Sequence, residues 1–328
     1  MKIFIAESID NVKLIEIISG KFTALESPVN SLLINQVKTI DLADAILIPH
    51  DAYDFAKNDS YLKYILEISK FKQIIFSDRS DFPVKPKIKN SISLRVALNP
   101  GESGENCIIV PYNVLSLNEI EPREYNRYPE ISFTGFTPRI LSPRRIIKSI
   151  KQSPKYPLTG NGAIVRKLAI TNCIENLPNF TLTKRDTYFT GIENRELRIP
   201  VRLEYLNSFK NSDFILTPRG DANQSTRFYE TLSAGRLALV PNSMMIFPQR
   251  LVNAEIFQKS ILLFNLKERN LNFKVSKFWE SNVTPTNYFQ LQKQIKQFYA
   301  DELEFNVFMR RLFRSDLDAF KKMANFRR

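Results

Sequence analysis

Short apolar runs rich in β-branched residues alternate along this chain with longer amphipathic segments. Strands buried on both faces of a parallel sheet read as such continuous runs, and amphipathic helices connect them. The pattern therefore predicts an α/β fold. In the first part of the chain, the predicted strands cover residues 2–6, 45–49, 73–77 and 107–110, and helices are predicted over 11–18 and 61–68.

A polar stretch at 116–129 interrupts this pattern, and its prolines and charges are typical of an interdomain linker. Beyond it, Ser142 and Pro143 predict the N-cap and the first position of a basic helix. The long aromatic and charged tail at 287–328 is predicted to be helical. The strands predicted in this second part cover residues 131–135, 213–217, 237–240 and 261–264.

Two lobes follow from this organisation, since 328 residues with 43% hydrophobic content suit two domains of ordinary size. We expect Rossmann-like lobes at 1–125 and 126–328, with the terminal helices at 287–328 packing back on the first lobe. Parallel sheets bind ligands beyond the carboxyl ends of their strands. Two facing lobes would place such a binding region in the cleft between them.

The positive charge is concentrated in the second lobe. Residues 1–125 hold 14 Lys and Arg against 17 Asp and Glu, and the remainder holds 33 against 17, which gives the net charge of +13. Such a charge suits nucleic acid, an anionic membrane surface, an acidic polysaccharide or a phosphate-bearing ligand. The anion-binding part of the chain is therefore expected to be the C-terminal one.

Cysteine and histidine are too scarce for several kinds of site. Cys107 and Cys173 are far apart and His50 is the single histidine, which excludes a disulfide framework and a zinc or His-rich metal site. The apolar run at the start is too brief for a signal sequence or a spanning helix. A cytoplasmic location is expected, with basic residues of the tail available for peripheral contact with anionic lipid.

The segment at 211–241 has the pattern of a strand, a polar loop, a short helix, a glycine stop and a second strand. Gly220 would let backbone amides approach a ligand closely, and Arg219 can offer a planar fork of donors to phosphate oxygens. Ser225 or Thr226 can cap the helix, whose N-terminal amides favour an anion. These parts suit a diphosphate.

Arg227 and Glu230 are three residues apart on that helix, so both side chains can face one side. A carboxylate beside a nucleotide can accept two hydrogen bonds from a ribose diol, and an arginine can neutralise the charge of a departing phosphate group. Gly235 stands where a helix would end in the left-handed conformation. The pair is therefore predicted to hold a nucleotide ligand.

This succession resembles the exostosin family of glycosyltransferases, in which Pro-x-Gly is followed by Ser-x-Arg-x-x-Glu and then by a glycine-led strand. The chain departs from the family pattern at Ile215 and Arg236, where the family has cysteines, and at Thr231 and Ala238. The matching residues are Phe214, Leu216, Pro218, Gly220, Ser225, Arg227, Glu230 and Gly235. Weaker likeness covers 43–49, 108–112 and the start of the second lobe, where Gly135, Arg139 and Arg144 follow the pattern.

The resemblance implies a GT-B fold and transfer of a sugar from a nucleoside-diphosphate sugar, such as a UDP- or GDP-sugar, to a glycan or lipid-linked acceptor. It implies inversion at the anomeric carbon and no essential metal. The donor-side residues would be Gly135, Arg144, Arg219, Gly220, Ser225, Arg227 and Glu230.

Inverting transfer needs a general base near the acceptor hydroxyl, and the strand ends of the first lobe supply the candidates. His50 and Asp51 are the leading candidates, because they follow a predicted strand directly. The imidazole of His50 also titrates near neutral pH without tuning. Glu7 and Asp78 are further options. The sequence does not choose among them.

Three other readings stay open. A fucosyltransferase-like enzyme would share the donor-lobe helix, although its acidic-Asn-Ser approach is replaced here by Pro218-Arg219-Gly220. A nucleotide-sugar epimerase has a similar fold. A basic nucleic-acid-binding protein would share the charge, but the sequence contains no recognition helix, zinc knuckle or aromatic sheet motif to support it.

Overall fold

The computed structural model describes residues 2–5, 35–36, 41–48, 70–78, 90–98, 106–138, 143, 147, 150, 155–156, 158–186, 195–220, 222–248, 253–315 and 317–324. The chain divides into two compact units. Unit 1 comprises 1–115, 246–250 and 303–328, and unit 2 comprises 116–245 and 251–302. Among the described residues, no helix combines the length and apolar character needed to cross a membrane.

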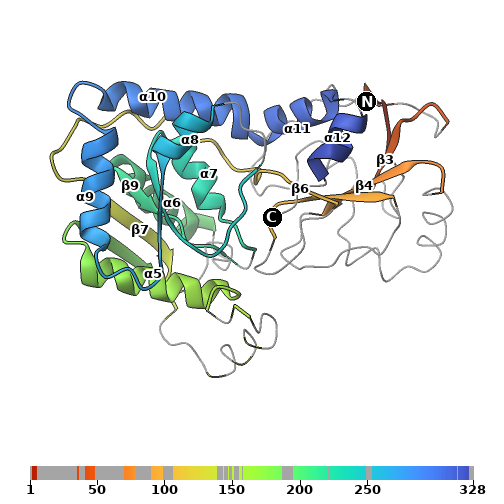
Figure 1. The fold of residues 1–328 in the computed structure, drawn as a ribbon. Helices are drawn as coiled ribbons and strands as arrows, with labels where there is room; N and C mark the ends of the chain where they lie inside the picture. The colour runs from red at the N-terminus through yellow and green to blue at the C-terminus, as the bar shows by residue number, and fades with distance from the viewer. Residues whose placement is uncertain are drawn as a thin grey trace. The chain divides into compact units, whose positions relative to one another are not determined.

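Unit 1 is built on a parallel sheet of six strands in the order β2-β1-β3-β4-β5-β6. Figure 1 labels β3, β4 and β6 of this sheet. Four of the strands lie where the apolar runs predict them. The short β2 and the serine-containing β5 lie outside those predictions, and β5 is nevertheless buried along its whole length. The bounds are β1 Lys2–Ile5, β2 Asn35–Gln36, β3 Ala45–Ile48, β4 Gln73–Asp78, β5 Ser91–Arg95 and β6 Cys107–Ile109.

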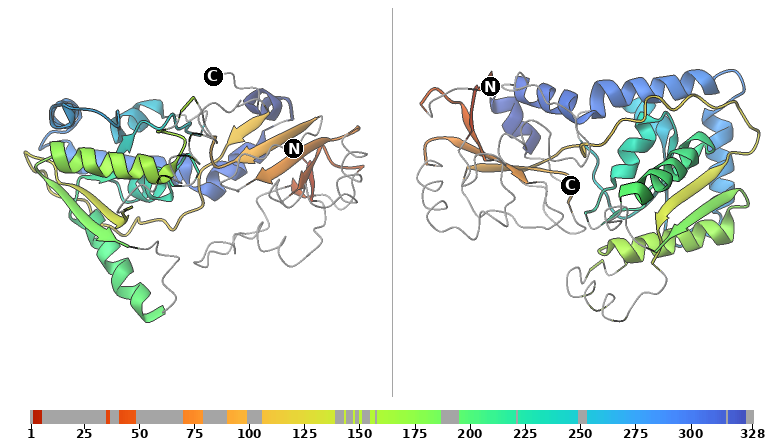
Figure 2. Two further views of the ribbon diagram at one scale, coloured as in Figure 1. Left: turned by 90° about the horizontal axis from the view of Figure 1, so that it is seen from below. Right: turned by 180° about the vertical axis from the view of Figure 1, so that it is seen from behind.

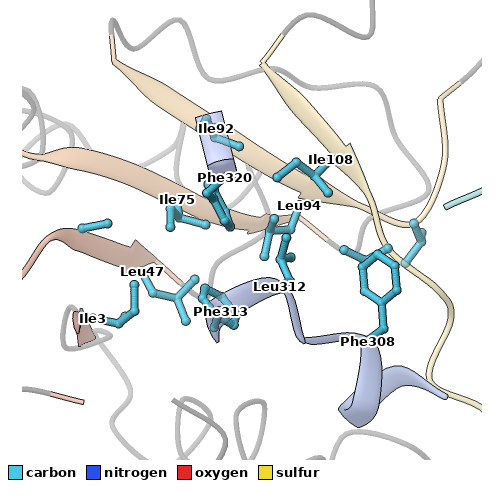
Figure 3. Packing of buried hydrophobic residues seen from close by; sticks show 13 residues of the cluster. Ile3, Leu47, Ile75, Ile92, Leu94, Ile108, Phe308, Leu312, Phe313 and Phe320 are labelled. Atoms are coloured by element: carbon cyan, nitrogen blue, oxygen red, sulfur yellow. The ribbon is translucent and has the colours of Figure 1, made fainter. Parts of the chain in front are cut away.

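The last two helices, α11 (Phe305–Arg314) and α12 (Leu317–Ala324), pack on the sheet of unit 1. Apolar residues recur on one side of α11, with Arg310 and Arg311 in the same helix left outside the core, so that one face of the helix can be buried. Figure 3 shows the shared core, in which side chains of both helices meet those of the strands. Its members include Ile3, Leu47, Ile75, Ile92, Leu94, Ile108, Phe308, Leu312, Phe313 and Phe320.

Unit 2 has a second parallel sheet, of five strands in the order β11-β10-β9-β7-β8. The α/β prediction, with a parallel sheet in each of two units, is confirmed. Strands β7, β9, β10 and β11 lie where they are predicted, and the edge strand β8 was not predicted because none of its residues is fully buried. The bounds are β7 Ile131–Phe136, β8 Phe180–Arg185, β9 Phe214–Leu216, β10 Leu237–Pro241 and β11 Ile261–Phe264.

Helices surround this second sheet. Helix α5 packs against α9, α6 lies beside β7, and α10 packs against α7 and α8 (Figures 1 and 2). The helical prediction for the tail is confirmed by α10, a π-helical turn at Tyr299–Leu303, α11 and α12. The helices of unit 2 are α5 Gly162–Asn176, α6 Arg195–Lys210, α7 Thr226–Ser233, α8 Ala254–Ser260, α9 Leu271–Asn282 and α10 Tyr288–Phe298.

The polar stretch at 116–129, predicted to be an interdomain linker, begins directly after the first range of unit 1 and is packed on unit 2. Leu117 and Ile120 are buried, and the Leu117 N–H donates to Ser233 Oγ at 2.9 Å. Lys296 Nζ of α10 donates to the carbonyls of Asn118 and Ile120. Side chains of α7 and α10 therefore satisfy backbone groups of this stretch that no regular element pairs.

A buried polar network ties the same stretch to β9 and α10. Asp213 is fully buried and accepts from Arg123 Nε at 2.9 Å, from the Tyr288 hydroxyl at 2.7 Å and from the Glu130 N–H at 2.8 Å. Gln292 accepts from Arg236 Nη1 at 2.5 Å. Asp213 therefore has three donors, which compensate the buried carboxylate for its lost contact with water.

Arg236 is a fully buried guanidinium and stands where the exostosin pattern has a cysteine. Its Nε donates to the Phe209 carbonyl and its Nη2 to the Glu121 carbonyl, both at 2.7 Å. Burial lowers the pKa of Arg236 to about 10, and the neighbouring Asp213 and Tyr288 partly oppose that shift. Arg236 thus has a structural role in unit 2.

Candidate functional site on the second unit

The predicted sequence of strand, loop, helix, glycine and strand is confirmed in unit 2 as β9, α7 and β10. Gly235 adopts the left-handed conformation with φ of +68°, and its N–H donates to the Leu232 carbonyl at 3.0 Å. A Cβ added at Gly235 would lie 2.7 Å from the Gln292 carbonyl oxygen. Both the turn and the close approach of α10 therefore require glycine at this position.

The loop after β9 uses its polar groups within the protein. Arg219 is 2% exposed, and its Nη1 donates to the Thr159 carbonyl at 2.7 Å. The Gly220 N–H donates to the Gln224 carbonyl at 3.2 Å, and a Cβ added at Gly220 would meet nothing within 4 Å. Neither the backbone conformation nor the neighbours of Gly220 therefore require a glycine.

Ser225 occupies the N-cap position of α7, as predicted. Its backbone is extended, with φ of −136° and ψ of 131°, and its side chain makes no capping hydrogen bond. The Phe228 N–H donates to the Ser225 carbonyl at 3.0 Å. The first turn of α7 is therefore not closed by the hydroxyl that usually satisfies an N–H group there.

Arg227 joins the start of α7 to the end of β7. Its Nη2 donates to the Thr134 carbonyl at 2.7 Å, and its guanidinium carbon lies 4.3 Å from the centre of the Phe133 ring. Gly135 has φ of +154°, and a Cβ added there would lie 2.8 Å from Arg227 Nη2. The guanidinium can therefore lie against the strand only because Gly135 has no side chain.

Glu230 is oriented by α6, which sequence reasoning missed. The Tyr205 hydroxyl donates to Glu230 Oε2 at 2.5 Å, and Arg202 Nη1 lies 3.4 Å from Glu230 Oε1. Arg202 and Tyr205 are three residues apart and lie on one side of α6. The same helical spacing that singled out Arg227 and Glu230 is therefore the signal that could have identified them. The ion-pair partner of Glu230 is thus Arg202, on another helix.

Tyr205 is the centre of this group, because both arginines face its ring. The guanidinium carbons of Arg202 and Arg227 lie 5.3 and 5.5 Å from the ring centre. Burial raises the pKa of the Tyr205 hydroxyl far above its ordinary value, and the Glu230 carboxylate raises it further, against a smaller lowering by Arg227. The hydroxyl therefore stays protonated and acts as a donor at all physiological pH values.

Several predicted residues lie outside the described residues: His50, Asp51, Glu7, Arg139 and Arg144. Asp78 is the last residue of β4, in register with Arg95 of β5. Of the basic helix, Pro143, Ile147 and Ile150 are described and helical. The roles predicted for these side chains remain predictions. The structure brings together Gly135, Arg227 and Glu230, and it places Arg219, Gly220 and Ser225 on the adjoining loop.

Comparison with known proteins gives distant structural likenesses. No protein-family model matches the chain. No curated protein matches it by sequence. Among solved structures, a glycosyltransferase from Rickettsia africae ESF-5 is 12% identical with a TM-score of 0.35, and each chain is 98% covered. The S. aureus protein MnaA, solved with UDP, is 12% identical with a TM-score of 0.33, over 98% of this chain and 96% of that one.

A third solved structure, the spinosyn forosaminyltransferase SpnP, is 11% identical with a TM-score of 0.31, over 95% of this chain and 90% of its own. The two parallel sheets themselves define the fold class, and the function depends on the residues of the site.

Substitution of Gly135 and of Gly220 by alanine should differ in its effect on stability, because only the backbone and neighbours of Gly135 require a glycine. Gly135→Ala is expected to lower the free energy of unfolding of unit 2 by about 1–3 kcal/mol, because of backbone strain and the contact with Arg227. Gly220→Ala should change it by less than about 1 kcal/mol. Urea denaturation followed by the fluorescence of Trp279, the single tryptophan, measures both. Equal effects would contradict the described geometry.

Proposed function

We propose that the protein is a glycosyltransferase that uses a nucleoside-diphosphate sugar, and that unit 2 binds this donor. The observation that carries the proposal is the group formed by Gly135, Arg227 and Glu230 together with Tyr205 and Arg202. Gly135 lies near the carboxyl end of β7, and α7 follows β9, so the group lies at the edge where parallel sheets bind ligands.

The chemistry of the group fits a nucleotide. A guanidinium beside the N-terminus of a helix favours the oxygens of a diphosphate, and a carboxylate accepts hydrogen bonds from the hydroxyls of a ribose. As the bond from the sugar to the diphosphate breaks, Arg227 would stabilise the charge that develops on the leaving group. The concentration of positive charge in residues 126–328 supports the same division of roles.

The finer points of the proposal come from the resemblance to the exostosin family. The acceptor would be a glycan or lipid-linked hydroxyl bound by unit 1, and transfer would invert the anomeric carbon without an essential metal. His50 or Asp51 would remove the proton from the acceptor hydroxyl as it attacks. Arg144 and Ser225 would complete the donor side by contact with the ligand, and Arg219 and Gly220 would do so through the shape of the loop, since their own polar groups bond within the protein.

A binding panel tests the donor site. UDP, GDP and ADP would be added separately, and the thermal midpoint of unit 2 would be followed by Trp279 fluorescence. One nucleotide should raise the midpoint, because a ligand at 100 times its Kd stabilises the folded state by about 2.7 kcal/mol. If no nucleotide responds while DNA or RNA binds tightly and loses affinity steeply with salt, the protein is a nucleic-acid-binding one.

A further inference from the structure

The helix α6 lies outside the strand, loop and helix segment that carries the family resemblance, yet it makes the side-chain contacts of Glu230. Tyr205 is 8% exposed, and its ring packs in a core cluster with Phe209 and Ile215. The hydroxyl of a tyrosine anchored in this way has little freedom. Its 2.5 Å hydrogen bond therefore fixes the position of Glu230 Oε2 relative to the sheet.

The contacts of Glu230 leave it able to bind a ligand. An ionised carboxylate offers about four acceptor positions. Tyr205 occupies one on Oε2, and Arg202 makes a longer contact with Oε1 at 3.4 Å. Among the described residues these are the two side-chain donors to the carboxylate, and the Glu230 side chain is 13% exposed. Capacity remains for the two hydroxyls of a ribose diol.

Two guanidinium groups lie near Glu230. Arg202 forms an ion pair with Glu230. The guanidinium carbons of Arg202 and Arg227 both lie over the Tyr205 ring. Arg202 Nη2 and Arg227 Nε are both buried and have no acceptor within the described part of the chain. With two guanidinium groups and one carboxylate, the group carries a net positive charge, which suits an anionic ligand that also bears hydroxyl donors.

We propose that Tyr205 and Arg202 are positioning residues for recognition of the ribose, holding Glu230 so that it distinguishes a ribonucleotide from a 2′-deoxyribonucleotide. This inference rests on the proposed donor site. It adds to that site a specificity function located on α6. A purely structural role for the two side chains would affect stability but would leave the discrimination between the two sugars unchanged.

The test measures the ratio of Kd values for a 2′-deoxynucleoside diphosphate and its ribonucleotide, using whichever of UDP, GDP and ADP binds. For the wild type we expect a ratio of roughly tenfold or more, since a hydrogen bond to a charged group is lost. Tyr205→Phe removes only the hydroxyl and should reduce the ratio to within about threefold of unity. Arg202→Gln should reduce it as well, and Arg202→Lys should restore most of it.

A matched control is Tyr288→Phe, because the Tyr288 hydroxyl also donates to a buried carboxylate, at 2.7 Å to Asp213. This variant should lose stability and keep the wild-type ratio. A wild-type ratio retained by folded Tyr205→Phe and Arg202→Gln would overturn the inference and leave the proposed donor site standing. Failure of the wild type to bind any nucleoside diphosphate would overturn the proposed function itself.

Discussion

Replacing Asp213 by alanine is expected to lower the free energy of unfolding of unit 2 by about 3–5 kcal/mol, because removing one partner of a buried ion pair leaves the other uncompensated. Asp213 is fully buried and accepts from Arg123, from the Tyr288 hydroxyl and from the Glu130 N–H. Arg236, also fully buried, would lose a nearby negative charge. Urea denaturation followed by Trp279 fluorescence reports on this unit directly, since the centres of the Trp279 and Tyr288 rings are 5.0 Å apart.

The control for this prediction is a more exposed ion pair of the same unit. Lys274 and Glu268 lie 3.5 Å apart, with side chains 38% and 24% exposed. Glu268→Ala should change the free energy of unfolding by less than about 1 kcal/mol. If Asp213→Ala were as mild as this control, the network of Asp213, Arg123 and Tyr288 would not be what holds the stretch at 116–129 on unit 2.

Replacing Glu230 by glutamine should weaken binding of the nucleoside diphosphate by about 10- to 100-fold, the value of hydrogen bonds to a charged acceptor. Glutamine keeps the shape of the side chain but removes the charge and half of the acceptor capacity. Isothermal titration with the nucleotide that the wild type binds measures the change. The thermal midpoint should stay close to that of the wild type, because the amide oxygen of glutamine can still accept from the Tyr205 hydroxyl.

Inorganic pyrophosphate separates the two parts of the proposed site. Glu230→Gln should leave pyrophosphate affinity unchanged or raised, because it removes a negative charge near the phosphate groups. Arg227→Met should weaken both ligands, since the guanidinium is proposed to contact the diphosphate. Equal loss of both ligands in Glu230→Gln would contradict the assignment of Glu230 to the ribose.

The sequence predicted the elements of the fold where apolar runs are continuous. Strands β3, β9, β10 and β11 are buried nearly throughout and were found, whereas β8 has no fully buried residue and gave no such run. In β5, Ser91 and Ser93 are polar but buried, so this strand, which lies between β4 and β6, has no continuous apolar run in the sequence. Continuity of apolar residues, more than local propensity, therefore decided which strands were recognisable.

The site was predictable as far as it lies within one segment of the chain. Arg227 and Glu230 share a helix, and Gly235 has the left-handed backbone that its position predicted. Tyr205 and Arg202 come from α6, some 25 residues earlier, and only folding brings them to Glu230. Helical spacing shows which residues share a face but not which helix that face will meet.

The contact between Gly135 and Arg227 also depends on folding, which brings together residues that are distant in the sequence. Ninety-two positions separate the two residues, and the sequence marks Gly135 only through the family pattern. Parallel pairing of β7 with β9 brings the end of β7 beside the helix that follows β9. The physical reason for glycine at 135, the 2.8 Å approach of a guanidinium to the position of a Cβ, becomes apparent only in three dimensions.

The most direct test of the proposed activity is release of nucleoside diphosphate from a panel of UDP- and GDP-sugars incubated with the protein. We expect release from one donor, and loss of that release in Arg227→Met under conditions where Trp279 fluorescence shows the variant to be folded. Absence of release from every donor, with no thermal stabilisation by any nucleoside diphosphate, would contradict the account.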